Sequence, residues 1–391
     1  MDDKTTQRIL VFATNYLPNI GGAELAFNEV ATRIPEISFD LIASRLNDPS
    51  DKNKLLSLEE KFKNVNVYRV GSRFNLARLV VPKALYPIAA YIKARELSKK
   101  FGPYSKIYAL QASQGGGGAW LFKTFNPGVV FLLNLQEGKD LKKQGFLINL
   151  FRRLIIKRAD VIIAISDYLR NYARAINKKA EMFVIPNGVN VQHFSKEINS
   201  SELTSFADSL GIEAGGKVVV SVSRLVHKNG IDILIKTFAI LGKRLSNIKL
   251  LLIGSGQEKN RLVELAKKLS ISDEIIWAGS VDNYDLPKYL KIADVFVRPS
   301  RSEGLGSAFL EAMAAGVPII GTQVGGIPDF LKDRETGLFC NVDDPEDLAQ
   351  KINAILNDNE LKDGLVSNGQ ALVSKKYDWQ NIAGVFKKTL L

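Results

Sequence analysis

Cysteine and histidine are scarce in this chain, and the scarcity limits the chemistry that it can carry. Of its 391 residues one is cysteine (Cys340) and two are histidine. A single cysteine cannot form an internal disulfide, which favours a reducing compartment. No cluster of Cys, His and Asp has the spacing of a metal site, so we expect neither a metal nor another cofactor.

Long apolar runs are also missing. No uninterrupted apolar stretch approaches the roughly 20 residues that a membrane-spanning helix needs. The first residues, MDDKTTQRILVFAT, lack the basic start, apolar stretch and small-residue cleavage site of a signal peptide. We therefore expect a cytoplasmic protein. Its length exceeds what one hydrophobic core usually holds, so we expect two α/β domains.

Negative charge is in short supply only in the first half. Residues 1–195 carry 29 Lys and Arg against 16 Asp and Glu, a net charge of +13, whereas residues 196–391 carry 24 against 25. Two stretches concentrate the excess: 69–106 has nine basic residues and one acid, and 139–158 has seven and one. Such a half suggests an anionic partner: a membrane surface, a polyanionic acceptor or nucleic acid. No recognised DNA or RNA motif supports nucleic acid.

Segment 141–158, LKKQGFLINLFRRLIIKR, mixes Leu, Ile and Phe with Lys and Arg over the length of a helix. This composition suits a helix that lies on an anionic lipid surface. An ordinary packed helix with an exposed basic face is the alternative.

Short β-branched runs alternate with longer amphipathic segments, as in doubly wound parallel sheets. Strands are expected in the first half at 9–14, 39–44, 65–70, 106–110, 128–133, 160–165 and 182–186. They are expected in the second half at 217–223, 248–255, 274–279, 294–299, 318–322 and 337–342. The polar stretch 190–212 reads as a linker. The pattern predicts two Rossmann-like domains that face each other across a central cleft.

The segment that carries the most chemistry begins at Glu303 and ends at Glu311. It follows an expected strand and enters an expected helix. Glycines at such a turn let backbone N–H groups approach an anion, and a diphosphate fits this position. The two carboxylates lie eight residues apart, about two helical turns, so both can face one ligand and accept hydrogen bonds from its hydroxyls. A helix entry with a capping glutamate is the structural alternative.

The stretch 299–339, PSRSEGLGSAFLEAMAAGVPIIGTQVGGIPDFLKDRETGLF, resembles the signature of family 4 of the retaining glycosyltransferases, which has the GT-B fold. Other segments agree with the family in order and spacing: GGAE (21–24), ADVIIAISDYL (159–169), VIPNGVNVQHF (184–194), SRLVHKNG (223–230) and LLIGSGQEKNRL (251–262). The resemblance implies an acceptor-side domain over 1–193 and a nucleotide-sugar-binding domain over 194–375. It also implies that a C-terminal helix, 376–391, crosses back to the first domain.

The resemblance also implies roles for individual residues. Arg224 and Lys228 would neutralise the donor diphosphate, where the leaving group develops negative charge. Glu311 would accept hydrogen bonds from the ribose, and Glu303 would hold the donor sugar near its 3-hydroxyl. The remaining donor-binding positions are Gly21 and Gly22 of the first domain and Gly254, Leu305, Gly306 and Ser307 of the second.

Two positions depart from the family pattern. The order here is Lys228-Asn229-Gly230, which places the lysine one residue earlier relative to the glycine than usual. Gln136 stands where many members have a histidine. A retaining enzyme can let the leaving diphosphate accept the acceptor's proton, so Gln136 need only hold the donor sugar. We interpret His193 as structural and His227 as a loop residue beside the diphosphate.

The sequence thus predicts a metal-independent hexosyltransferase. It would use a nucleotide-sugar donor (a UDP-sugar is favoured, with GDP-mannose as the alternative) and a glycolipid, lipid-linked or saccharide acceptor. The first domain would bring it to the inner face of the cell membrane. A nucleotide-sugar epimerase or hydrolase on the same fold, or a catalytically silent binding module, are the alternatives. Two weaker features are Gly115–Gly118, either a close approach to a ligand or a flexible turn, and Asp140, which could orient an acceptor hydroxyl.

Overall fold

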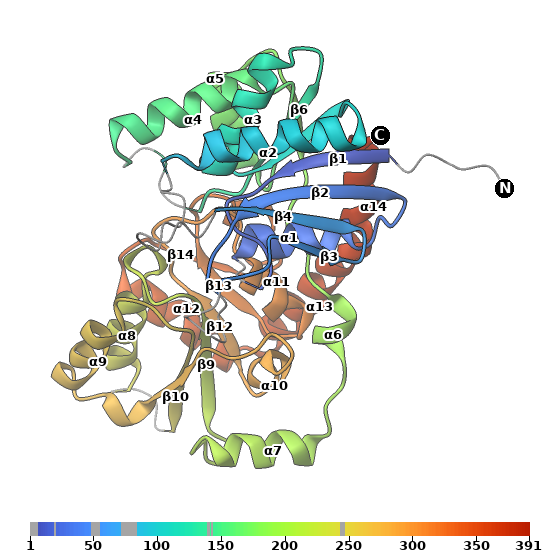
Figure 1. The fold of residues 1–391 in the computed structure, drawn as a ribbon. Helices are drawn as coiled ribbons and strands as arrows, with labels where there is room; N and C mark the ends of the chain where they lie inside the picture. Colours follow the sequence, from blue (N-terminus) through green and yellow to red (C-terminus); the bar gives the residue numbers. More distant parts are fainter. Residues whose placement is uncertain are drawn as a thin grey trace. The chain divides into compact units, whose positions relative to one another are not determined.

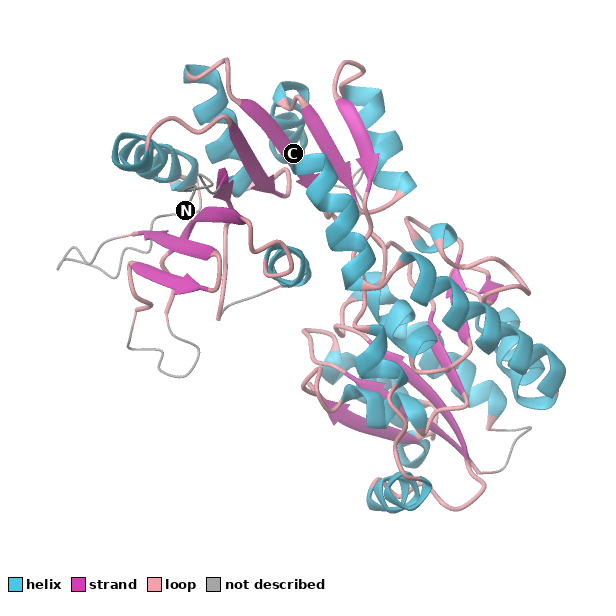
Figure 2. Cartoon of the chain, turned by 90° about the vertical axis from the view of Figure 1, so that its right-hand side faces the viewer, coloured by secondary structure: helices cyan, strands magenta, loops and turns pink. Residues whose placement is uncertain are grey.

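A computed structural model describes residues 7–18, 21–47, 55–71, 84–138, 141, 144–242 and 247–391. The chain divides into two compact units, of which the first is Met1–Pro186 with Ile382–Leu391 and the second is Asn187–Asn381. Each unit is a twisted sheet flanked by helices (Figures 1 and 2). None of the described helices is both long and apolar enough to cross a lipid bilayer.

The described part of the first unit contains one sheet in the order β3-β4-β2-β1-β5-β6-β7-β8. Neighbouring strands are parallel except β3 and β4, which are antiparallel. The strands are β1 (Gln7–Phe12), β2 (Ile37–Ser44), β3 (Glu59–Phe62), β4 (Val65–Val70), β5 (Lys106–Leu110), β6 (Val130–Leu135), β7 (Val161–Ala164) and β8 (Glu181–Val184). The inner strands are apolar on both faces because helices cover both faces of a parallel sheet.

Helices cover the two faces of this sheet unequally. The helices are α1 (Gly22–Ala31), α2 (Tyr86–Phe101), α3 (Gln114–Phe125), α4 (Phe146–Arg158) and α5 (Asp167–Ile176). In Figure 1, α2, α3 and α4 lie on one side of the sheet, and α1 lies on the other side. The C-terminal helix α14 (Trp379–Leu390) joins α1, because Phe386 packs edge-on against Tyr108, which stacks on Phe27 of α1. The expected return of this helix to the first domain is confirmed.

The second unit contains, among its described residues, a parallel sheet in the order β11-β10-β9-β12-β13-β14. Its strands are β9 (Lys217–Val222), β10 (Ile248–Ile253), β11 (Ile275–Gly279), β12 (Val295–Arg298), β13 (Ile319–Thr322) and β14 (Leu338–Cys340). Its α-helices are α6 (Val191–Ser195), α7 (Ser200–Ser209), α8 (Ile231–Leu241), α9 (Lys259–Lys268), α10 (Leu286–Lys291), α11 (Ser307–Ala314), α12 (Pro345–Asn357) and α13 (Asn359–Lys376). Short 3-10 turns are η1 (His227–Asn229), η2 (Ser272–Glu274) and η3 (Ile327–Asp329).

The alternation of side chains along each strand builds two cores in this unit. Val295 and Val297 of β12 belong to a core with α8, α9 and α12. Phe296, between them, faces the other way and packs on Phe309 of α11, with ring centroids 5.1 Å apart. The chain therefore anchors α11, the helix that carries Glu311, through an aromatic contact to β12.

All the strands expected from the sequence are present, and the two Rossmann-like sheets confirm the predicted fold class. The segment 190–212, which reads as a linker, instead holds α6 and α7, and no side chain of α7 is buried. The expectation of a flexible turn at Gly115–Gly118 is wrong, because these glycines lie buried in the first turns of α3. A close approach of a ligand to this backbone stays a prediction. A Cβ at Gly117 would meet the ring of Phe151 at 2.5 Å, so these glycines let α3 and α4 pack closely.

Candidate active site

Four loops of the second unit leave neighbouring strands at the carboxyl edge of its sheet. They follow β10, β9, β12 and β13, which are adjacent in that order. Gly254, after β10, adopts φ +132°, and a Cβ there would lie 1.9 Å from the carbonyl oxygen of Ser223. Only glycine allows this approach. The backbone of Leu225 then bonds to Ser255 at 2.9 Å, so the β10 loop supports the β9 loop that carries Arg224 and Lys228.

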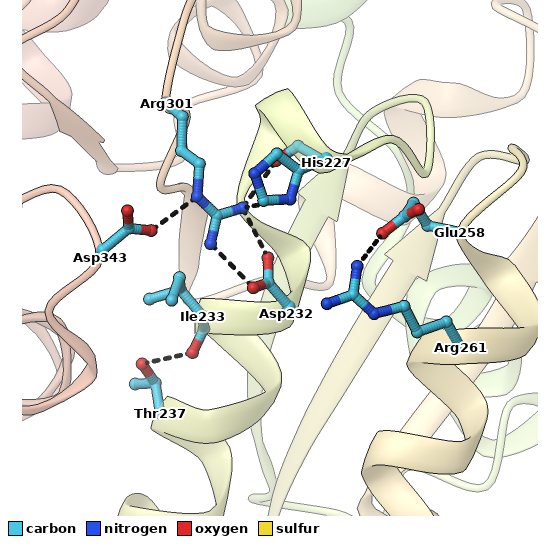
Figure 3. Close-up of polar contacts among 8 residues, drawn as sticks. All are labelled: His227, Asp232, Ile233, Thr237, Glu258, Arg261, Arg301 and Asp343. Carbon is cyan, nitrogen blue, oxygen red and sulfur yellow. Dashed lines mark hydrogen bonds and ion pairs between the residues drawn. The ribbon is translucent and has the colours of Figure 1, made fainter.

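Arg301, in the loop after β12, fixes the β9 loop from the other side (Figure 3). Its guanidinium donates two hydrogen bonds of 2.8 Å to Asp232 of α8, and one of 2.7 Å to the carbonyl of His227. A further bond of 2.6 Å reaches Asp343. Burial alone would raise the pKa of Asp232, but the bond and charge of Arg301 outweigh it and hold the pKa below its usual value. The hydrogen bonds of Arg301 therefore hold the loop that carries Lys228 in one position.

Glu303 lies at the centre of these loops and is 7% exposed. One carboxylate oxygen, Oε1, accepts a hydrogen bond of 2.9 Å from the backbone of Gly304 and lies 3.6 Å from Nζ of Lys228. The other oxygen forms an ion pair with Arg298. Gly306 caps α11 in a left-handed conformation, and no side chain bonds at this cap. The alternative of a capping glutamate is therefore wrong.

The spacing of the two carboxylates suggested that they lie two turns apart on one helix, but they do not share a helix. Glu303 precedes α11, which begins at Ser307, and Leu305 is buried between them. Glu311 lies on α11, where burial raises its pKa to about 7, while the charge of Arg298 and a hydrogen bond from Asn283 act against the rise. Both carboxylates nevertheless interact with one guanidinium, that of Arg298.

The expected cations gather at the same loops. Nζ of Lys228 lies 3.4 Å from the carbonyl of Ser302, so the one-residue shift in the sequence leaves its ammonium beside Glu303. Arg224 is exposed, and its carbonyl accepts a hydrogen bond of 2.6 Å from the side chain of Asn229. The charge of Arg224 acts on Arg298. The carboxyl edge of this sheet thus combines three cations with two carboxylates: Arg224, Lys228 and Arg298 with Glu303 and Glu311.

Arg298 and Arg301 are functional candidates that sequence reasoning missed. Arg298 is a charged residue directly after the apolar run VFV (295–297), which is an unusual place for arginine. That position was the available signal. No signal in the sequence marks Arg301, because its partners Asp232 and Asp343 are 69 and 42 residues away.

Both histidines lie in the second unit, and the place of His227 beside the diphosphate stays a prediction. Nε2 of His193 lies 3.1 Å from the carbonyl of Asn283, and its ring stacks on Tyr284. His227 lies in η1, held through its carbonyl by Arg301. Across the described ranges, no three Cys, His, Asp or Glu side chains are grouped so that they could hold a metal ion.

The first unit carries the other predicted residues. Gly21 is the N-cap of α1, its N–H donates a hydrogen bond of 3.0 Å to Glu24, and Gly22 is the first residue of that helix. Gln136 directly follows β6 and is partly buried. Asp140 and parts of both basic stretches lie outside the described residues.

Glu137, next to Gln136, was not singled out from the sequence. Its Oε1 accepts a hydrogen bond of 2.9 Å from the backbone of Ala112. Burial raises the pKa of this carboxyl, and the Ala112 bond and the charge of Arg152 on α4 only partly offset the rise. Glu137 thus links the segment after β6 to the segment after β5 and to α4.

Models of two glycosyltransferase families match most of the chain. A family model described as Glycosyltransferase Family 4 matches residues 20–193, and one described as Glycosyl transferases group 1 matches residues 204–372. The chain is 32% identical over 224 residues to an uncharacterized glycosyltransferase of Methanocaldococcus jannaschii, covering 57% of each protein.

Two further proteins match almost the whole chain. One is a GDP-mannose-dependent monoacylated alpha-(1-6)-phosphatidylinositol monomannoside mannosyltransferase of Corynebacterium glutamicum, 26% identical, with 96% of this chain and 95% of that protein covered. The other is HepE of Anabaena, solved in complex with UDP and glucose, with a TM-score of 0.80 at 20% identity, covering 98% and 99%. At that identity the structural likeness shows the fold alone. The chain belongs to glycosyltransferase family 4 and has the GT-B fold.

Proposed function

We propose that this protein is a retaining, metal-independent glycosyltransferase that moves a sugar from a nucleotide-sugar donor to a glycolipid, lipid-linked or saccharide acceptor. The observation that carries the proposal is the arrangement of Lys228 and Glu303 on adjoining loops beside Glu311 of α11, with the ammonium 3.6 Å from the Glu303 carboxylate. Cations suit a diphosphate, and carboxylates suit the hydroxyls of a ribose and a sugar.

In this proposal each group has one task. Arg224 and Lys228 neutralise the diphosphate, Glu311 accepts hydrogen bonds from the ribose, and Glu303 accepts them from the donor sugar. The backbone N–H groups of Leu305, Gly306 and Ser307 lie beside the ligand, as does the loop of Gly254. Gly21 and Gly22 of the first unit are the further donor-binding positions in this proposal, and the N–H of Gly21 is already bonded to Glu24.

The chemical step follows from these assignments. The acceptor hydroxyl attacks the anomeric carbon on the face that the diphosphate leaves, so the new glycosidic bond has the configuration of the old one. As the bond from the anomeric carbon to the phosphate oxygen breaks, the hydroxyl proton passes to that oxygen. No protein base is needed, and the two cations stabilise the negative charge that develops on the leaving group.

For the donor we favour a UDP-sugar, with GDP-mannose as the alternative. HepE was solved with UDP and glucose, whereas the Corynebacterium relative is named for GDP-mannose and a phosphatidylinositol mannoside. A thermal-shift panel of nucleoside diphosphates and their sugars decides between them. A ligand at 100 times its dissociation constant adds roughly 2.7 kcal/mol to the unfolding free energy. No shift with any nucleotide would contradict the proposal, and binding without acceptor-dependent release of nucleoside diphosphate would favour a silent binding module.

Gln136 offers a separate test of the first unit's role. If Gln136 holds the donor sugar, Gln136→Ala lowers turnover by up to about tenfold, the effect of one lost hydrogen bond of about 1.4 kcal/mol, and changes nucleotide affinity little. The measurement is the steady-state rate of nucleoside diphosphate release, alongside equilibrium binding of the nucleotide. Unchanged turnover would remove Gln136 from the site.

The acceptor proposal rests on the surface formed by α2, α3 and α4. Phe146 and Leu147, at the start of α4, are 78% and 76% exposed, and Ile148 beside them is also exposed. Arg153 and Lys157 are exposed on the same helix. Exposed Ile88 and Ile92 of α2 and Phe125 of α3 extend the apolar surface. Apolar side chains flanked by basic ones suit an anionic lipid surface, which a glycolipid acceptor would supply.

The vesicle experiment isolates this surface. We expect the protein to bind anionic vesicles in low salt. Replacing Phe146, Leu147 and Ile148 together by serine should weaken binding at least about tenfold, since each buried apolar side chain contributes about 2 kcal/mol. Val385→Ser, on the exposed side of α14, is the control and should bind as the wild type does. If the wild type ignored anionic vesicles in low salt, the membrane part of the proposal would fail.

A further inference from the structure

Arg298 is a charged residue in a buried position, and burying a charge is costly unless other groups compensate it. It ends β12, pairs in register with Gly321 of β13, and is only 8% exposed. A buried guanidinium loses its hydration, and the loss is large unless nearby anions replace it. Arginine commonly buries its apolar stem and extends its head group into water. Arg298 does not.

The anions that face Arg298 are the two carboxylates of the candidate site. Its guanidinium forms an ion pair with Glu303, and the charge of Glu311 also stabilises it. Its guanidinium carbon lies 5.8 Å from the centre of the Phe309 ring, so α11 covers it. Burial and the charge of Arg224 lower the pKa of Arg298 to about 10, which still leaves it cationic at neutral pH.

Without this cation, the carboxylates of Glu303 and Glu311 would lie at the same edge of the sheet with no buried guanidinium beside them. Like charges in such a setting disfavour each other's ionisation, and one of them takes up a proton. A protonated carboxyl accepts fewer and weaker hydrogen bonds than a carboxylate. The guanidinium is therefore suited to keep both groups charged and to hold Glu303 in one orientation.

We propose that Arg298 is a positioning residue of the donor site, which fixes Glu303 by an ion pair and keeps Glu303 and Glu311 ionised so that both accept hydrogen bonds from the donor. This inference rests on the proposed function of the site. Nothing in it requires Arg298 to touch the donor. Its effect on the donor passes through the two carboxylates.

The pH dependence of nucleotide binding reports this role. The groups that face Glu311 are Arg298 from β12 and Asn283 from the loop after β11, whose carbonyl bonds to His193 of α6. From α13, Gln370 approaches the end of α11 at Gly316. The pKa of Glu311 is raised to about 7, and the charge of Arg298 opposes the rise. Nucleotide affinity should thus increase with pH through about 7, and loss of Arg298 should move that increase to higher pH.

The experiment is the affinity for UDP, measured by calorimetry from pH 5.5 to 9, in wild type and in Arg298→Met, Arg298→Gln and Arg298→Lys. We expect the midpoint to rise by about one pH unit or more in the Met and Gln variants, with affinity at pH 7 about tenfold lower. The Lys variant keeps the charge, so its midpoint should stay close to that of the wild type.

Several outcomes would overturn the inference. A uniform loss of affinity with an unchanged midpoint indicates a structural role only, and a Lys variant shifted as far as the Met variant excludes a role of the charge. Two neutral variants are used because either one can fail to fold. If the wild type binds no nucleoside diphosphate at any pH, the proposed function itself fails. If it binds and the Met and Gln midpoints do not move, only the role of Arg298 fails.

Discussion

Lys228→Ala should lower the turnover number about 100-fold or more, with a smaller effect on the Michaelis constant. Its ammonium lies 3.6 Å from the Glu303 carboxylate and 3.4 Å from the Ser302 carbonyl, on a loop that Arg301 holds in place. A fixed charge at the leaving diphosphate stabilises the transition state more than the ground state, and loss of one such group typically costs about 100- to 1000-fold.

Steady-state kinetics of nucleoside diphosphate release measure this effect. Lys268→Ala, which removes an exposed lysine from the end of α9, is the matched control and should leave both constants unchanged. A turnover number within about threefold of the wild type would remove Lys228 from the catalytic step. Lys228→Arg should retain part of the activity, because the charge stays while the geometry changes.

Gly325→Ala should have two effects: it should destabilise the second unit and displace Glu303. Gly325 adopts φ +56°, and a Cβ at this position would lie 1.7 Å from the carbonyl oxygen of Glu303. Because the contact is with backbone, no side chain can move aside to relieve it. Left-handed strain and overpacking together cost about 2–4 kcal/mol.

Chemical unfolding and donor binding measure the two effects. Gly364→Ala in α13 is the control, because a Cβ there meets no heavy atom within 4 Å. That substitution should leave stability unchanged or raise it by up to about 1 kcal/mol, since alanine favours the helix. If Gly325→Ala unfolded like the wild type and bound the donor equally well, the loop after β13 would not support Glu303.

The fold was predictable because its strands are apolar runs whose spacing leaves room for helices. The one described strand that was missed, Glu59–Phe62, is charged and short, and it pairs antiparallel with its neighbour through a local hairpin. Gly115–Gly118 were misread because glycine is unfavourable inside a helix. There, close packing against α4 decides the conformation, and no local pattern reveals packing.

The candidate site was only partly predictable for a similar reason. Glu303, Glu311 and Lys228 stand in recognisable segments, so sequence reasoning finds them. Arg301 contributes through contacts with groups distant along the chain, such as Asp232. Arg298 is close to Glu303 in sequence, but its burial appears only in the folded chain. Burial and the charge of neighbouring residues set the pKa of Glu311 near 7, and neither is visible before the chain is folded.

The most direct test of the account is equilibrium binding of UDP and GDP to wild type, Glu311→Gln and Glu264→Gln at pH 8. Glu264 is an exposed carboxylate of α9, paired with Lys267 at 3.0 Å, and controls for the loss of one negative charge. Hydrogen bonds to a charged group contribute about 1.5–3 kcal/mol. The account predicts that Glu311→Gln weakens the preferred nucleotide at least about tenfold while Glu264→Gln does not. Equal affinity in all three proteins would place the nucleotide elsewhere and contradict the account.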